Sequence, residues 1–136
     1  MKILHGTTAW FDMVGALMKD AAAQAALPAD FNVSLVERYT DGVQLGAGLA
    51  QGLRFEIVGG KPSFRLGAGP NEQADITVEV TVAGSRQLNT LHGADPRFSA
   101  ALAKLQSTGQ LKIDGDLARL GGWFDGVHDQ IVQRTR

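Results

Sequence analysis

Hydrophobic residues recur along this chain with two different spacings, and each spacing predicts one kind of secondary structure. In residues 8–27 they return every three, four or seven positions, which is typical of one face of a helix, and Pro28 ends the pattern. The apolar positions of that face are Trp10, Val14, Leu17, Ala21 and Ala25. Residues 8–27 are therefore expected to form an amphipathic helix.

Residues 33–80 instead alternate apolar and polar positions, as strands with one buried face do. Strands are predicted at residues 33–39, at 53–57, around Phe64 and Leu66, and at 74–80, with turns at Asp41-Gly42 and Gly59-Gly60. A further alternating stretch, residues 43–50, is interrupted by glycines, which weaken a strand.

After Val82 the helical spacing returns. It predicts a short helix at 86–92, a helix opened by Asp95-Pro96, a strand at 109–114 and a final amphipathic helix over 117–131. Strands separated in this way from helices indicate an α+β fold, with helices on one face of a largely antiparallel sheet.

Composition narrows the class of protein. The chain has 136 residues, 44% of them hydrophobic, which suits one domain over 1–136 with its own core. The formal net charge is -1 without clustered Lys or Arg, so no nucleic-acid partner is expected. The absence of cysteine excludes disulfides and thiolate metal sites. With no signal peptide and no long apolar stretch, we expect a cytoplasmic protein without stable membrane insertion.

Three segments together resemble the sterol carrier protein type-two (SCP-2-like) domain family. They are the hairpin "LRFEIVGGKPSFRLGAG" followed by "ADITVEVT", the helical stretch "LHGADPRFSAALAKL", and "TGQLKIDGDLARL", which is similar to the family's recurrent strand and helix start. The resemblance is strongest over residues 53–136 and weakest in the glycine-rich 42–52. It implies a five-stranded sheet with helices on one face, enclosing an apolar tunnel that holds a lipid, fatty acyl chain, sterol or isoprenoid intermediate.

The resemblance implies ligand-binding residues but no catalytic set and no cofactor. The tunnel would be lined by Phe55, Ile57, Phe98, Leu102, Leu105, Trp123, Phe124, Val127 and Ile131. The same residues would equally suit an ordinary packed core, because pockets and cores have the same composition. His128 follows Phe124 by one helical turn and would contact a polar head group if it reaches the tunnel.

Other chemistry finds little support in the sequence. His5, His92 and His128 lack the spacing of a metal site, and the glycine runs match neither a dinucleotide fingerprint nor a P-loop. A small isomerase or hydratase would need a carboxylate that points into the apolar interior. The alternation predicts that Asp75, Glu79 and Asp114 point outward instead.

Two alternatives to a lipid carrier remain. One is a partner-binding or oligomerising accessory module, a homodimer or the partner of a lipid-metabolising enzyme, with an exposed apolar patch at Trp10, Phe11 and Met18. The other is a small enzyme that uses Asp12, Asp116 or His128. In the segment "GQLKIDGD" we expect Leu111 and Ile113 to face the core and Asp116 to cap the final helix.

Overall fold

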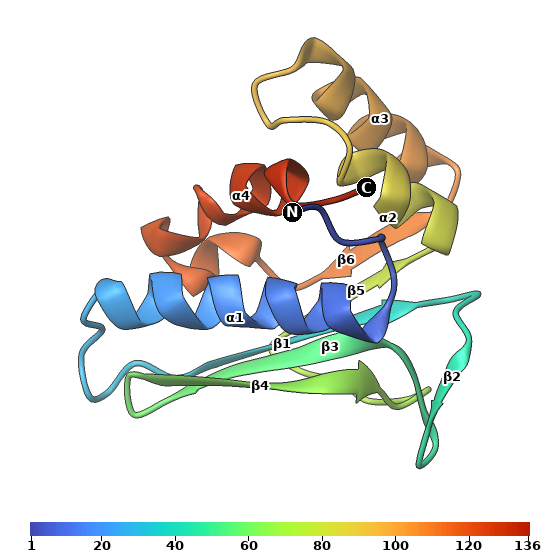
Figure 1. The fold of residues 1–136 in the computed structure, drawn as a ribbon. Helices are drawn as coiled ribbons and strands as arrows, with labels where there is room; N and C mark the ends of the chain where they lie inside the picture. The colour runs from blue at the N-terminus through green and yellow to red at the C-terminus, as the bar shows by residue number, and fades with distance from the viewer.

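The computed structural model describes all 136 residues and has an α+β fold, as the alternation of patterns predicts. Its elements are α1 (Thr8–Gln24), β1 (Val33–Tyr39), β2 (Gln44–Gly46), β3 (Leu49–Val58), β4 (Lys61–Ala68), β5 (Ile76–Val80), α2 (Val82–Leu88), α3 (Pro96–Ser107), β6 (Leu111–Asp114), the 3-10 turns η1 (Leu117–Leu120) and η2 (Gly122–Phe124), and α4 (Val127–Gln133). All the helices lie on one face of the sheet (Figure 1).

The sheet has six strands where the resemblance implies five, and it is mixed. The order is β2-β3-β1-β5-β6, with β4 paired to β3. The sixth strand is the short, exposed β2 at one edge, formed by the glycine-rich segment. Antiparallel pairing prevails, but β1 and β5 run parallel, with Leu35 opposite Ile76 and Tyr39 opposite Val80. The three strands between them in sequence lie on the other side of β1, which makes this parallel pairing possible.

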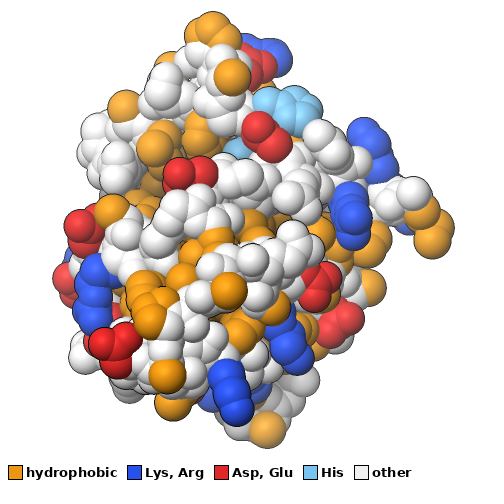
Figure 2. Space-filling model, turned by 90° about the vertical axis from the view of Figure 1, so that its left-hand side faces the viewer, with side chains coloured by type: hydrophobic (Ala, Val, Ile, Leu, Met, Phe, Trp, Pro, Cys, Tyr) orange, Lys and Arg blue, Asp and Glu red, His pale blue; other side chains and the backbone are white.

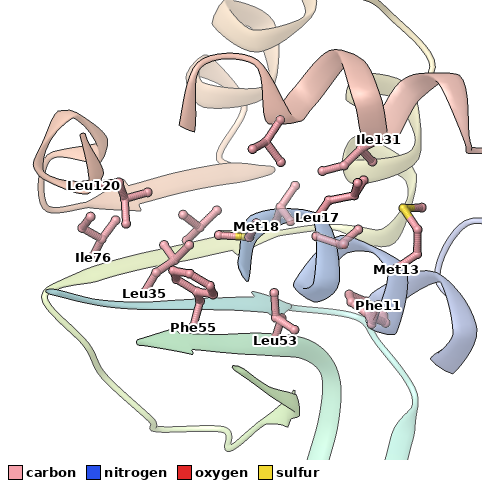
Figure 3. Packing of buried hydrophobic residues seen from close by; sticks show 14 of the residues in the cluster. Phe11, Met13, Leu17, Met18, Leu35, Leu53, Phe55, Ile76, Leu120 and Ile131 are labelled. Carbon is pink, nitrogen blue, oxygen red and sulfur yellow. The ribbon is translucent and has the colours of Figure 1, made fainter. Parts of the chain in front are cut away.

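Helix α1 begins where Thr7 accepts a hydrogen bond from the backbone N–H of Trp10 at 3.2 Å. Its apolar face lies against the sheet, and Leu35, Leu53 and Phe55 rise from the strands toward Leu17 and Met18 (Figure 3). Close approach of α1 requires Gly15, because a Cβ there would lie 2.3 Å from the ring of Phe64 on β4. The core therefore lies between the sheet and the helices.

The prediction of one continuous amphipathic helix over 117–131 is wrong. The segment forms η1, η2 and then α4, because Gly121 takes a φ of 107° and interrupts the helix. The short helix predicted at 86–92 begins earlier, where Thr81 accepts from the N–H of Gly84 at 3.0 Å and opens α2. The strand of "GQLKIDGD" is confirmed, and Leu111 is buried. Asp116 is a cap as predicted, since it accepts from the N–H of Ala118 at 2.9 Å, but it opens the short η1 and not the final helix.

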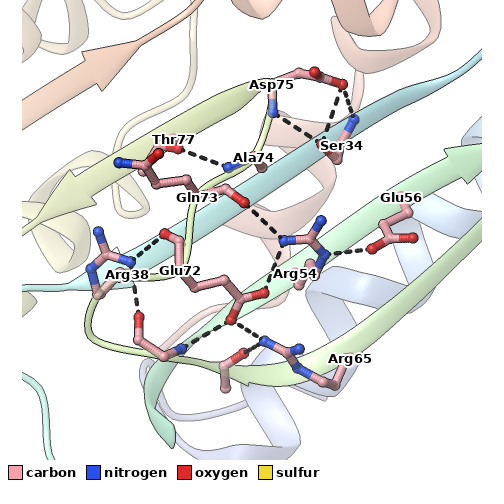
Figure 4. Close-up of polar contacts among 12 residues, drawn as sticks. Ser34, Arg38, Arg54, Glu56, Arg65, Glu72, Gln73, Ala74, Asp75 and Thr77 are labelled. Atoms are coloured by element: carbon pink, nitrogen blue, oxygen red, sulfur yellow. Dashed lines mark hydrogen bonds and ion pairs between the residues drawn. The ribbon is translucent and has the colours of Figure 1, made fainter.

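The opposite face of the sheet is covered by the loop between β4 and β5 rather than by a helix (Figure 4). Arg38 donates to the carbonyl oxygens of Gly69 at 3.0 Å and Glu72 at 2.9 Å. The carboxylate of Glu72 in turn pairs with Arg54 and Arg65. These charges hold the loop across the strands, so the outer face is polar and the apolar interior lies on the helix side alone.

Candidate functional site

A cavity of about 360 Å³ lies between the helix-bearing face of the sheet and the helices, within the ~300–1,000 Å³ usual for ligand pockets. Of its 23 lining residues, 17 are hydrophobic. The sheet contributes Leu35, Glu37, Leu53, Val78, Val80, Leu111 and Ile113; the helices and turns contribute Trp10, Phe11, Val14, Met18, Ser85, Leu88, Asn89, Gly93, Phe98, Leu102, Leu117, Phe124, Asp125, Val127, His128 and Ile131. We call this cavity the apolar pocket.

Two of the residues that line the apolar pocket, Gly93 and Asp125, are exposed. Figure 2 shows one side of the molecule, on which hydrophobic side chains are visible between polar ones. A second hollow, of about 390 Å³, lies between α2 and α3, but only three of its seven lining residues are hydrophobic. The apolar pocket is therefore the better candidate for a ligand site.

The structure divides the residues predicted to line a tunnel into two groups. Five of the nine apolar residues, and His128, line the apolar pocket; the five are Phe98, Leu102, Phe124, Val127 and Ile131. The other four, Phe55, Ile57, Leu105 and Trp123, lie outside it. Phe55 and Ile57 are fully buried, and the Phe55 ring packs against that of Trp123 at 5.6 Å between centroids. On β3, Leu53 is aligned across β1 with the pocket residue Val78, whereas Phe55 is aligned with Ile76, which does not line the pocket.

Helix α1 supplies one wall of the apolar pocket, although three of its residues are predicted from the sequence to form an exposed patch. Trp10, Phe11 and Met18 were expected in an exposed patch, but their exposed fractions are 2%, 1% and 3%. All three line the pocket together with Val14. The prediction of an exposed patch at these residues is therefore wrong, because the helix turns this face toward the sheet.

Glu37 is the one acid that the sheet places on the apolar pocket, and the sequence analysis missed it. It lies on β1 opposite Leu53 on one side and Val78 on the other, and both of these neighbours line the pocket. Residues directly opposite one another point to the same face of a sheet, so the Glu37 side chain faces the helices. Its carboxylate forms no hydrogen bond or ion pair with the protein, and burial raises its pKa to about 7.

The sequence contained a signal for this residue. In "VSLVERY", Val33, Leu35 and Tyr39 share one face of the strand, and Glu37 stands between Leu35 and Tyr39 on that face. A carboxylate among alternating apolar residues is unusual, because burying an unpaired charge is costly. Of the three acids predicted to point outward, Asp75 and Asp114 are exposed, and Glu79 is half-buried and pairs with Arg38 at 3.3 Å on the outer face.

A buried polar cluster lies beside Glu37 and consists of His5, Tyr39 and Ser85. The Tyr39 hydroxyl lies 2.6 Å from the Ser85 Oγ and 3.0 Å from the His5 Nε2, which is 3.1 Å from that same Oγ. Burial, together with the charge of Arg86, lowers the pKa of His5 to about 4. Burial and the Glu37 charge raise the pKa of Tyr39. The cluster is thus a network of neutral groups, with Ser85 reaching the pocket wall.

Asn89 and His128 are oriented by backbone carbonyls. The Asn89 amide donates to the Ser85 carbonyl oxygen at 2.8 Å, which leaves its own side-chain oxygen without a protein partner. His128 Nε2 lies 2.8 Å from the carbonyl oxygen of Leu91 and must be the donor, since a carbonyl only accepts. The Nδ1 of a neutral His128 is then an acceptor. The imidazole also packs on Phe98 at 4.6 Å between centroids.

These groups do not form an acid–base pair or a metal centre. Glu37, on the pocket wall, has no histidine within hydrogen-bond distance, although the isomerase or hydratase hypothesis needs one. Asp12 and Asp116 are exposed. No three His, Asp or Glu side chains lie close enough together to hold a metal ion. Nor does any helix combine the length and apolar character that crossing a bilayer requires.

No protein-family model and no curated protein matches this sequence. Among solved structures, sterol carrier protein 2 is 15% identical with a TM-score of 0.53, and the alignment covers 97% of this chain and 99% of that one. The ubiquinone synthesis protein UbiJ-SCP2 is 17% identical over 92% of this chain and 89% of its own, with a TM-score of 0.48.

The first structures matched are much longer proteins. The stereoselective inverting sec-alkylsulfatase Pisa1 from Pseudomonas sp. is 23% identical with a TM-score of 0.46, and the match covers 85% of this chain but only 15% of the sulfatase. The full-length match to sterol carrier protein 2 agrees with the α+β order of elements and with helices on one face of the sheet. The chain therefore has the fold of sterol carrier protein 2.

Proposed function

We propose that this protein binds an apolar or amphipathic small molecule non-covalently in the apolar pocket and acts as a lipid-binding or carrier domain without catalysing a reaction. The observation that supports this most directly is the cavity itself, since 17 of its 23 lining residues are hydrophobic in a chain of 136 residues. A tightly packed core would leave no space of this size.

Burial of hydrocarbon supplies the free energy of binding in this proposal. Each methylene moved from water into the pocket contributes about 0.8 kcal/mol, so an alkyl chain needs few polar contacts. The residues proposed to contact it include the five that the sequence analysis had already named, Phe98, Leu102, Phe124, Val127 and Ile131. Leu53 and Val78 form the floor of the same space.

The first test looks for lipids that co-purify with the protein. Native mass spectrometry of gently purified protein should show a bound lipid, and titration with added lipids should change the fluorescence of Trp10, whose ring lines the pocket. Trp123 lies outside it and serves less well as a reporter. No bound species and no response across several lipid classes would contradict the proposal.

A variant that fills the pocket tests the location. Leu102 is half-buried on α3 and lines the pocket, so Leu102→Trp should occupy part of its volume and weaken binding of a neutral probe such as Nile red by about tenfold. Val58→Trp is the matched control, because Val58 is 61% exposed and lies away from the pocket. Equal Nile red affinity in both variants would place the ligand elsewhere.

A homodimer or an enzyme partner stays a separate prediction. Gel filtration of the protein with and without bound lipid tests it, since an accessory module should form a stable assembly whether or not the pocket is filled.

A further inference from the structure

The polar atoms that line the apolar pocket and have no protein partner are all hydrogen-bond acceptors. They are the Glu37 and Asp125 carboxylates, the side-chain oxygen of Asn89 and, in neutral His128, the Nδ1 atom, because the donors of Asn89 and His128 are already directed to backbone carbonyls. The Ser85 hydroxyl is satisfied by Tyr39 and His5. A ligand that pairs with this wall must therefore supply the hydrogens.

The charged residues around the pocket also favour a ligand that donates hydrogen bonds. No Lys or Arg is among its lining residues, whereas two carboxylates, Glu37 and Asp125, are. Of the elements packed around Glu37, α1 presents Trp10, Phe11, Val14 and Met18, and β3, β5 and β6 present only aliphatic side chains. The other titratable groups nearby are Tyr39, His5 and His128. Arg86, whose charge helps to lower the pKa of His5, does not line the pocket.

We propose that Glu37 determines the specificity of the apolar pocket: it selects apolar molecules whose polar end is a hydrogen-bond donor, a hydroxyl or an ammonium group, and disfavours those that end in an ionised carboxylate. This inference rests on the proposed function, and it adds the class of ligand and the residue that recognises it. An unpaired carboxylate in an apolar pocket gains a partner only from the ligand, and hydrogen bonds to an ionised group are about twice as strong as neutral ones. Burial in the apolar pocket raises the pKa of this carboxyl to about 7.

Three ligands that differ only in their polar end test the proposal: decylamine, decanol and decanoate, each displacing Nile red from the wild-type protein. The measurement is made at about pH 5.5 and about pH 8.5, on either side of the Glu37 pKa of about 7. Glu37 is ionised at the higher pH, so decylamine should bind about tenfold more tightly there and decanoate about tenfold more weakly. Decanol should change less, because its hydroxyl pairs with either form.

Glu37→Gln should abolish both pH dependences and bring the affinities for decylamine and decanoate together. Asp114→Asn removes one negative charge from an exposed position outside the pocket and should behave as wild type. Whichever of decanol and decylamine loses more affinity in Glu37→Gln identifies hydroxyl or ammonium as the preferred group. If Glu37→Gln folds poorly, Glu37→Leu replaces it, and the wild-type pH series needs no variant at all.

The possible failures are distinguishable. If Nile red does not bind to the wild-type protein, and native mass spectrometry shows none of the three ligands bound, the proposed function and this inference fail together. Nile red binding with no preference among the three ligands, or with decanoate bound most tightly, overturns the inference and leaves the proposed function in place. The same holds if Glu37→Gln keeps the wild-type preferences.

Discussion

At the scale of single residues, Glu37 shows how a position can be simple to locate and still be overlooked. The alternation of β1 assigns it to the same face as Leu35 and Tyr39, which is the face the helices cover. Outward positions of Asp75 and Asp114 followed from the same rule. The rule was sufficient for all three acids, but the absence of a partner for Glu37 depends on side chains from distant elements.

Glu37 should make the stability of the protein fall as pH rises. Its pKa is raised by burial from 4.5 to about 7, so the folded state holds this proton more tightly than the unfolded state does. Stability is therefore full below about pH 4.5 and is lost as pH rises through 7, by about 3 kcal/mol at most. Urea denaturation at several pH values should show that Glu37→Gln gains this stability relative to wild type only above about pH 5.

The prediction would be contradicted if the free energy of unfolding differed between Glu37→Gln and wild type by the same amount at every pH. It would mean that the carboxyl is solvated or paired in the folded state. Asp114→Asn, an exposed change of the same charge, should show no such pH-dependent difference.

At the scale of elements, the junction between β6 and η1 is where the sequence motif and the structure agree best. Gly115 turns the chain with a φ of 102°, and a Cβ at this position would lie 2.4 Å from the Asp75 carbonyl oxygen. Asp116 then accepts from the N–H of Ala118 and begins η1. The two acids around this glycine are thus a strand's exposed end and a helix cap, and neither faces the apolar pocket.

Asp116→Ala should lower the free energy of unfolding by roughly 0.5–2 kcal/mol, because a backbone N–H loses its capping acceptor. Ligand affinity of the folded protein should stay unchanged, since Asp116 does not line the pocket. Asp114→Ala serves as the control and should stay within about 0.5 kcal/mol of wild type. Weaker ligand binding by Asp116→Ala at unchanged stability would contradict a purely capping role.

At the scale of the whole molecule, the two ends of the chain lie together next to α4 (Figure 1). Ile3 and Thr135 form a parallel bridge, with the Ile3 N–H donating to the Arg134 carbonyl oxygen at 2.7 Å. The indole N–H of Trp10 donates to the Thr135 Oγ1 at 3.0 Å. Trp10 lines the pocket, and Thr135 follows α4, whose residue Ile131 also lines it. The contact between Trp10 and Thr135 therefore joins two walls of the pocket.

Thr135→Val keeps the side-chain volume and removes the acceptor for the buried Trp10 N–H. It should lower the free energy of unfolding by about 1–3 kcal/mol, the cost of an unsatisfied buried donor. Thr108→Val is the control, because the Thr108 hydroxyl is exposed and bonds only carbonyls of its own helix and the amide of its near neighbour Gln110. Thermal or urea unfolding compares the two variants, and equal stability would show that the contact does not hold the ends together.

The sequence by itself determined the first helix, predicted over 8–27 and observed over 8–24, together with the positions of the main strands, the α+β class and the cap at Asp116. It could do so because hydrophobic spacing and capping act between near neighbours. It did not determine the break at Gly121 or the edge strand β2. Only the tertiary structure decided that β1 and β5 pair in parallel, that Leu53 rather than Phe55 reaches the pocket, and that Glu37 has no partner. Those facts depend on the register between strands far apart in the chain, and a shift of one residue would have turned each side chain to the other face.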